Sequence, residues 1–250
     1  MVGSVHTLNS ELKNDPEYSA SLNGLQTASE AFGEHQATGV FIPHFPKSWF
    51  ERSSSLKKII WCGSATRKWG ECGALDHCRT PEFYDDDPND KDRHAISKSI
   101  FWRTMRSVGC HLEKSVTSFD PELKYSKHNQ PETVVWSNVF RVGGPNGEPS
   151  RRLQQAQIQD CIACLKREIH LAKPNAVIFH TGYLSTNFTQ AYFGAQDVGE
   201  DIPGCDGRVG VYAQAKTTVP HIWMTRHTKH TDQIRISDAL AALNYAGVFK

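Results

Sequence analysis

The chain has 250 residues and a mass of 28.0 kDa, which suffices for one large or two small domains with a sizeable core. Hydrophobic residues make up 38% of it and aromatic residues 10%, which excludes a disordered protein. Its 28 Lys and Arg residues against 27 Asp and Glu residues give a net charge of +1. This balance excludes a globally basic nucleic-acid binder but leaves room for an enzyme with one local basic face.

Several features predict a cytoplasmic protein that makes no membrane contact. No apolar run approaches the roughly 18 residues of a membrane helix. The first residues lack the basic end and apolar stretch of a signal peptide. The seven cysteines are odd in number and lack a framework spacing, which favours reduced thiols over disulfides. We expect a monomer.

The beginning of the chain differs from the rest. Residues 1–35 are polar and weakly patterned, with one short helix expected around residues 25–32. Residues 41–50 hold two prolines and four aromatic residues and are expected to form an irregular arm. We therefore predict an N-terminal extension, residues 1–50, that packs on a main domain formed by residues 51–250.

Four short apolar runs, rich in Val, Ile, Trp or Phe, have the length of buried strands. They are residues 58–62, 133–137, 176–179 and 221–225. Continuous apolar runs without alternation favour strands covered on both faces, as in a parallel sheet.

Helical patterns separate these runs. The clearest covers residues 150–172, with Ser150 as its N-cap and Lys173-Pro174 after its end. Shorter apolar stripes predict a helix around Phe101–Val108 and another around Ile236–Leu243. The alternation predicts an α/β fold, a three-layer α/β/α sandwich with a central, mainly parallel four-stranded sheet.

One charged region interrupts the alternation. Residues 85–99 are rich in Asp and Lys and contain a proline, so residues 72–99 are interpreted as a surface insertion. A solvated loop is one interpretation of it, and a flap that contacts DNA is the other.

Polar residues follow each apolar run. In an open parallel sheet, ligands bind outside the carboxyl ends of the strands, so these residues are expected to converge on one cleft. The residues singled out are Gly63, Ser64, Ala65, Thr66, Trp69, Asn138, Arg141, Arg226, His227, Lys229 and His230.

The order of these segments carries a family resemblance. The segments are residues 59–66 with Trp69-Gly70, 134–138 with Val142-Gly143, 173–182, and 227–229. Together they resemble the motifs of the uracil-DNA glycosylase superfamily, in particular its phage and bacterial branch, which includes anti-phage glycosylases of modified bases. The resemblance covers about residues 56–247, so residues 51–250 are interpreted as a glycosylase-like domain.

The resemblance implies roles for the strand ends. A base leaves the DNA stack, enters a pocket and is cut from its sugar to leave an abasic site. Asn138 would read the base edge with its amide, although it could instead bond its own loop. His227 would donate to the leaving base.

The base-binding set would be Gly63, Ser64, Thr66, Trp69 and Asn138. Trp69 would stack on the base, with helix–sheet packing as the alternative. Arg141, Arg226, Lys229 and His230 would neutralise DNA phosphates, with a solvated face as the alternative. Two histidines, His227 and His230, are too few for a metal site, so no metal and no cofactor are expected.

Two positions depart from the family pattern. Thr228 replaces the proline that follows the histidine, and Ala65 stands where the family places Asp, Asn or Glu. That residue positions or activates the attacking water, or stabilises the sugar cation. Three explanations stay open for Ala65: an inactivating substitution, a carboxylate from elsewhere such as Glu71, or a protein that binds a base without cutting it.

The sequence therefore predicts a DNA glycosylase, acting on uracil or on a modified cytosine such as glucosylated hydroxymethylcytosine, with a place in anti-phage defence. The alternative is a non-catalytic protein on the same scaffold that binds DNA or a modified base. A hydrolase of small nucleosides is a third interpretation.

Overall fold

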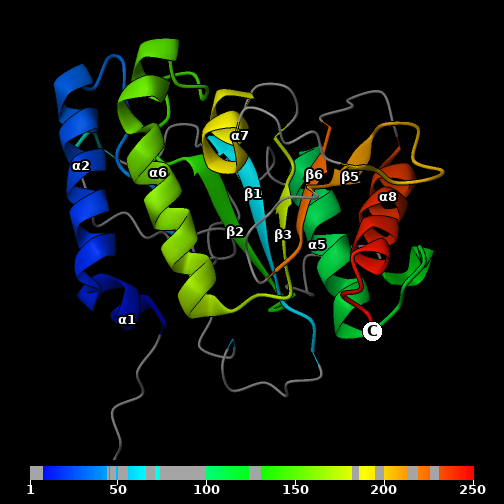
Figure 1. Ribbon diagram of the computed structural model, residues 1–250. Helices are drawn as coiled ribbons and strands as arrows, with labels where there is room; N and C mark the ends of the chain where they lie inside the picture. Colours follow the sequence, from blue (N-terminus) through cyan, green and yellow to red (C-terminus); the bar gives the residue numbers. More distant parts are fainter. Residues whose placement is uncertain are drawn as a thin grey trace, which may run out of the picture.

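The computed structural model describes residues 8–43, 45, 49, 56–65, 71–73, 99–123, 131–181, 186–194, 200–212, 219–225 and 231–250. Within these parts the chain is an α/β sandwich of three layers (Figure 1). None of the helices in the described parts is long and apolar enough to cross a membrane.

The central layer is a six-stranded sheet. Its strands are β1 (Ile59–Ala65), β2 (Val134–Phe140), β3 (Ala176–Phe179), β4 (Glu200–Asp201), β5 (Val209–Val211) and β6 (His221–Met224). They lie in the order β2-β1-β3-β6-β5-β4. The first four in that order are parallel, and β5 and β4 extend the sheet with antiparallel pairing.

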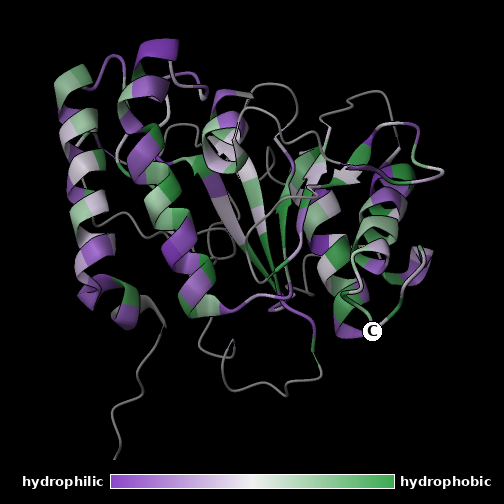
Figure 2. Ribbon diagram, viewed as in Figure 1, coloured by the Kyte–Doolittle hydropathy of each residue, from purple (hydrophilic) through white to green (hydrophobic). Residues whose placement is uncertain are grey.

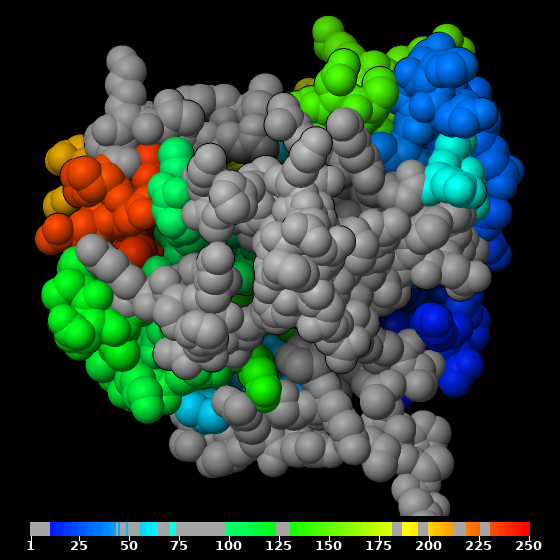
Figure 3. Space-filling view, turned by 180° about the vertical axis from the view of Figure 1, so that it is seen from behind, coloured from blue at the N-terminus to red at the C-terminus, as the bar shows by residue number. Residues whose placement is uncertain are grey.

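Two helices cover one face of the sheet, α5 (Ile100–Glu113) and α8 (Asp232–Tyr245). Met105 and Val108 of α5 and Leu240 of α8 pack against Trp61 and other residues of this face in one apolar cluster. The space-filling view from behind shows α5 and α8 on one side of the molecule and α2 on the other (Figure 3).

The opposite face is covered by α6 (Arg151–Ala172) and α7 (Thr186–Phe193), and the N-terminal helices α1 (Leu8–Asn14) and α2 (Pro16–Phe32) pack against α6. A second apolar cluster joins Leu22 and Leu25 of α2 to Leu165 of α6 and to Cys62 of β1. Ser150 caps α6 by accepting a hydrogen bond from the Leu153 amide, as the sequence predicts.

The N-terminal segment is more ordered than the sequence suggests. α2 runs for 17 residues rather than the short stretch expected around residues 25–32. Its apolar stripe is hard to detect because polar Ser21 and Ser29 share the buried side with leucines. The arm that follows lies along the end of β2, where the Phe41 amide donates to the Arg141 carbonyl at 2.7 Å.

The four predicted strands and three predicted helices are confirmed, but the sheet prediction was wrong in its strand number. β4 and β5 are two and three residues long, too short to leave a periodic signal. β1 and β2 also run past the predicted ends, because Gly63 pairs with Asn138 and Ala65 with Phe140. Residues 74–98, most of the predicted charged insertion, lie outside the described residues.

Candidate functional site

The order of the parallel strands places a switch point at β1. From β1 the chain crosses through α5 to β2 on one side, then through α6 to β3 on the other. Ligand sites of open α/β sheets lie at the carboxyl ends of strands where the direction of winding reverses. Figure 2 shows that the central strands are most hydrophobic at their beginnings and become paler toward this edge.

Gly63, Asn138 and His180 stand in one row across this edge. Gly63 is paired with Asn138 of β2, and on the other side the His180 amide donates to the Cys62 carbonyl at 2.9 Å, one step beyond the Cys62–Phe179 pair. Side chains alternate along a strand, so Asn138 and His180 point to the face that α5 covers. The His180 ring accordingly lies against Trp61 of that face, with centroids 5.7 Å apart.

The glycine in the middle of the row makes room for the amide. A Cβ placed on Gly63 would lie 2.7 Å from Oδ1 of Asn138 and 3.3 Å from the ring of Phe101. The first approach is too close for a Cβ, and the second would require the Phe101 ring to shift by a few tenths of an ångström. Gly63 therefore lets the Asn138 amide lie across β1 beneath Phe101.

The Asn138 amide has a fixed orientation. The indole N–H of Trp136 donates to Asn138 Oδ1 at 3.1 Å, and an indole nitrogen can only donate. The atom that faces Trp136 must therefore be the amide oxygen. The nitrogen, Nδ2, faces away, is buried, and has no hydrogen-bond partner in the described structure.

Burying a hydrogen-bond donor without a partner lowers the stability of the folded protein. Asn138 is 1% exposed, and a buried donor without a partner costs about 1–3 kcal/mol. Buried polar groups without partners are rare and call for a specific explanation. A ligand with an acceptor oxygen would satisfy Nδ2.

Aromatic rings surround the row. The Phe101 ring stacks on His180 with centroids 5.5 Å apart and an interplanar angle of 27°. Trp102, the next residue of α5, packs edge-on against Trp136 at 4.6 Å. The polar row is thus enclosed by flat apolar surfaces, the kind of surface on which nucleobases stack.

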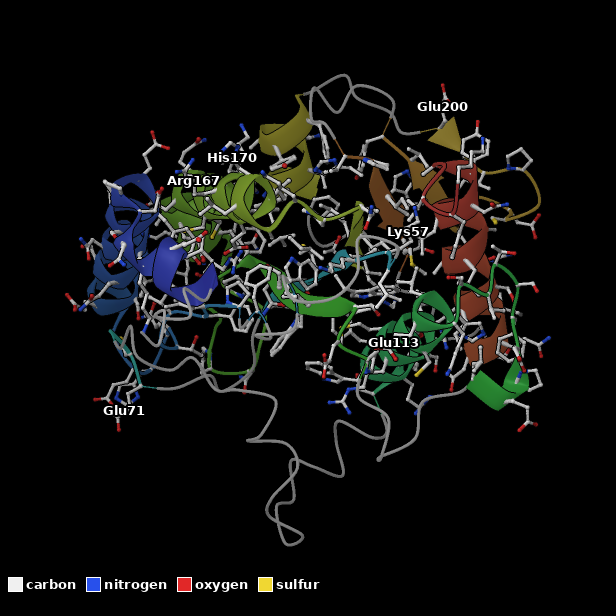
Figure 4. All side chains as sticks on the ribbon, turned by 90° about the horizontal axis from the view of Figure 1, so that it is seen from below. Lys57, Glu71, Glu113, Arg167, His170 and Glu200 are labelled. Carbon is white, nitrogen blue, oxygen red and sulfur yellow. The ribbon has the colours of Figure 1, made fainter. Side chains whose placement is uncertain are left out.

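The carboxylate of Glu148 reaches the end of β1 from the connection between β2 and α6. The Ser64 hydroxyl donates to Oε1 of Glu148 at 2.8 Å. Glu148 lies in the connection between β2 and α6, just before the Ser150 cap, and is exposed. Glu71, which the sequence suggested as a substitute carboxylate, lies instead at the α2 edge, away from the strand ends (Figure 4).

Arg141 was wrongly predicted to contact DNA. It is 1% exposed, and its Nη2 donates to Glu168 Oε2 at 2.7 Å, so its charge is buried under α6. Tyr18 of α2 donates its hydroxyl to the other oxygen of Glu168 at 2.8 Å. Burial raises the pKa of Glu168, an effect that Arg141 opposes. This network ties α2 and α6 to β2 and cannot reach a phosphate.

Exposed arginines stand nearby. Arg151 and Arg152 form the first turn of α6, which begins at the same edge as the ends of β1 and β2 (Figure 1). The N-terminus of a helix also carries partial positive charge. These two residues are exposed basic groups at this edge that could contact a phosphate.

Thiol chemistry at this edge is disfavoured. Cys62 is buried directly before Gly63, and burial raises the pKa of its thiol to about 12. Thiols of this kind stay protonated and unreactive. Among the described residues, no group of three or more His, Cys, Asp or Glu side chains could hold a metal ion.

The other predicted site residues divide into two groups. The backbones of Gly63, Ser64 and Ala65 form the end of β1, beside Asn138. Thr66, Trp69, Arg226, His227, Lys229 and His230 lie outside the described residues.

Sequence reasoning passed over Phe101, Trp136, Glu148 and His180 as site residues. Trp136 was detectable, because it stands two positions before Asn138 on one strand and so shares its face. Glu148 had no signal, because only the fold brings its loop to Ser64. No family model and no curated protein matches this chain.

Proposed function

We propose that the chain is a DNA glycosylase that hydrolyses the N-glycosidic bond of a flipped base and leaves an abasic site. The order of strand-end motifs supports this activity, and so does the three-layer fold, which brings Gly63, Ser64, Ala65 and Asn138 to one edge. Base excision requires the base to leave the stack and be held by its edge. The family assignment is part of the same proposal.

The buried Asn138 amide carries the proposal. It is held by Trp136, lies across Gly63 and keeps Nδ2 without a partner in the described structure. A flipped pyrimidine would offer a carbonyl oxygen to that donor and a flat face to the neighbouring aromatic rings. In most structures the donor of a buried Asn is satisfied by the protein, so an unpartnered Nδ2 favours a ligand.

The fixed orientation of the amide favours an oxo base. Uracil carries carbonyl oxygens at positions 2 and 4, whereas cytosine and its glucosylated derivative carry an amino group at position 4. An amino group facing Nδ2 would place two donors against each other. Cytosine offers acceptors only at O2 and N3, so if Nδ2 faces position 4 of the base, we favour uracil over a modified cytosine.

Other parts of the scheme rest on the sequence. His227 stays the predicted donor to the leaving base, and a role in anti-phage defence stays part of the proposal. Arg151 and Arg152 take the place of Arg141 as candidate phosphate contacts, together with Arg226, Lys229 and His230. The scheme requires no cofactor.

Ala65 favours a second candidate, a protein that binds a flipped base without cutting it. Alanine has no proton chemistry, and it stands at the end of β1, where the family carries its acidic or amide residue. Such a reader would use the same Asn138 contact. Cleavage separates the two candidates.

An abasic-site assay tests the proposal. Duplex and single-stranded DNA with uracil, plain DNA and glucosylated phage DNA are incubated with the chain, treated with alkali and examined for strand breaks. We expect breaks at uracil. Asn138→Ala should lower their rate by about 100-fold, the size typical of losing one well-placed donor. Asn244→Ala, a change on the exposed side of α8, should leave the rate unchanged.

Breaks only in glucosylated DNA would support the glycosylase activity but refute uracil as the base. The absence of breaks in every DNA, with the chain and with Ala65→Glu alike, would refute the glycosylase. If DNA binding then still depended on Asn138, the reader would be the better description.

A further inference from the structure

The end of β1 lacks a carboxylate of its own but receives one from a loop. Hydrolysis of an N-glycosidic bond needs a negative group near the sugar and a water that gives up a proton. Ala65 supplies neither. We propose that Glu148 supplies the missing carboxylate for the reaction proposed above, on which this inference rests.

The hydrogen bond from Ser64 holds Glu148 in place. Ser64 is 2% exposed and is the residue directly before Ala65, and its hydroxyl donates to Oε1 of Glu148 at 2.8 Å. The hydroxyl belongs to the rigid end of a central strand. A glutamate from a loop is thereby anchored at the switch point.

The anchor lies close to the base-reading amide. Ser64 follows Gly63, and Gly63 pairs directly with Asn138. Consecutive Cα atoms are about 3.8 Å apart and neighbouring strands about 4.8 Å apart, so the two anchoring positions lie within about 10 Å. Side chains alternate along β1, so Ser64 points to the face opposite Asn138. A nucleotide held by Asn138 would place its sugar near this carboxylate by extending across the carboxyl end of β1.

Exposure suits Glu148 to the task. The residue is exposed although Ser64 is buried, so solvent water reaches the carboxylate at the edge of the sheet. Glu71 lacks such an anchor to the strand ends: its neighbour Cys72 bonds the Ser29 carbonyl of α2 at 3.0 Å. Figure 4 shows Glu71 at the periphery of the molecule.

The step balances without any further reactant. The bond between C1′ and the base nitrogen breaks, and its electron pair leaves with the base. The water oxygen bonds to C1′ while one water proton passes to the Glu148 carboxylate. Glu148 then returns that proton to solvent and the base anion takes one up, which yields an abasic sugar and the free base.

Three variants test Glu148. Glu148→Gln keeps the size and a hydrogen bond to Ser64 but removes the charge, and we expect it to slow base release by at least about 100-fold, as for loss of a general base. DNA binding should persist. The double variant Ala65→Glu with Glu148→Gln should regain release, because a carboxylate then stands at position 65. Glu71→Gln, the matched control, should release base at the original rate.

The outcomes separate this inference from the proposed function. If the unaltered chain and Glu148→Gln release base at equal rates, the proposed role of Glu148 is refuted and the proposed glycosylase activity is supported. If only chains with Ala65→Glu release base, the scaffold is a glycosylase and Glu148 contributes nothing. If no variant releases base from any DNA, both are refuted. If Glu148→Gln is slow and the double variant is not rescued, the loss is structural and Glu148 is again refuted.

Discussion

At the scale of single residues, Gly63 and Asn138 form one unit. The glycine is required by its neighbour and not by its own backbone, because a Cβ would meet the Asn138 amide at 2.7 Å. The amide is in turn oriented by Trp136, two residues earlier on the same strand. The candidate site therefore depends on Gly63 of β1 and on Trp136 and Asn138 of β2.

We expect Gly63→Ala to disturb this unit. Overpacking of this kind costs about 1–3 kcal/mol, and the displaced amide should lose its place for a ligand. Urea unfolding and the abasic-site assay measure the two effects. In an Asn138→Ala background the added methyl group no longer meets an amide, so its cost should fall. Equal costs in both backgrounds would show that the amide is not what Gly63 accommodates.

At the scale of elements, β6 is attached to α7 through a buried histidine. His221 begins β6, its Nε2 lies 3.1 Å from the Tyr192 hydroxyl of α7, and its ring stacks on Phe179 at 5.8 Å. Burial lowers the pKa of His221 to about 4. The neutral ring is the form that this packing accepts.

The lowered pKa predicts acid sensitivity. An unfolded histidine has a pKa of about 6.5, so between about pH 6.5 and 4 the unfolded chain binds a proton that the folded chain does not. The free energy of unfolding should fall as pH falls, by up to about 2 kcal/mol from pH 6.5 to 5. Urea unfolding at these pH values measures it.

His221→Gln should flatten this dependence, whereas the exposed His170→Gln should not. An unchanged slope in His221→Gln would show that other groups cause the acid sensitivity.

The elements also show what a sequence can predict. The strands β1, β2, β3 and β6 and the helices α5, α6 and α8 could be predicted, because burial on one or two faces leaves a regular pattern. Asn138 could be placed at a strand end. The Glu148 contact and the burial of Arg141 could not, because each depends on a residue brought close only by the fold.

At the scale of the whole molecule, the net charge is only +1. Attraction of DNA would therefore have to come from a local group of basic residues. Arg151 and Arg152 lie in the first turn of α6, at the edge of the candidate site, while Lys13 and Lys114 lie at the ends of α1 and α5. α1 lies at the other edge of the sheet (Figure 1). If the chain binds DNA as proposed, the contact is therefore expected at this edge only.

We expect Arg151→Ala with Arg152→Ala to weaken DNA binding and to reduce its salt dependence. Removing one phosphate-binding side chain should lower the slope of log affinity against log salt by about 0.9, so the pair should lower it by about 2. Titrations at several salt concentrations measure the slope. The control pair, Lys13→Ala with Lys114→Ala, should retain it, and an equal reduction there would indicate diffuse attraction.

The contact between Tyr18 and Glu168 has a consequence for synthesis of the chain. The two residues are 150 positions apart, so α2 leaves the ribosome long before its partner on α6 has been made. Until then α2 lacks α6, the helix against which it packs in the folded protein. Its attachment is therefore a late event in folding, and the nascent chain carries an exposed amphipathic helix that chaperones can recognise while the sheet assembles.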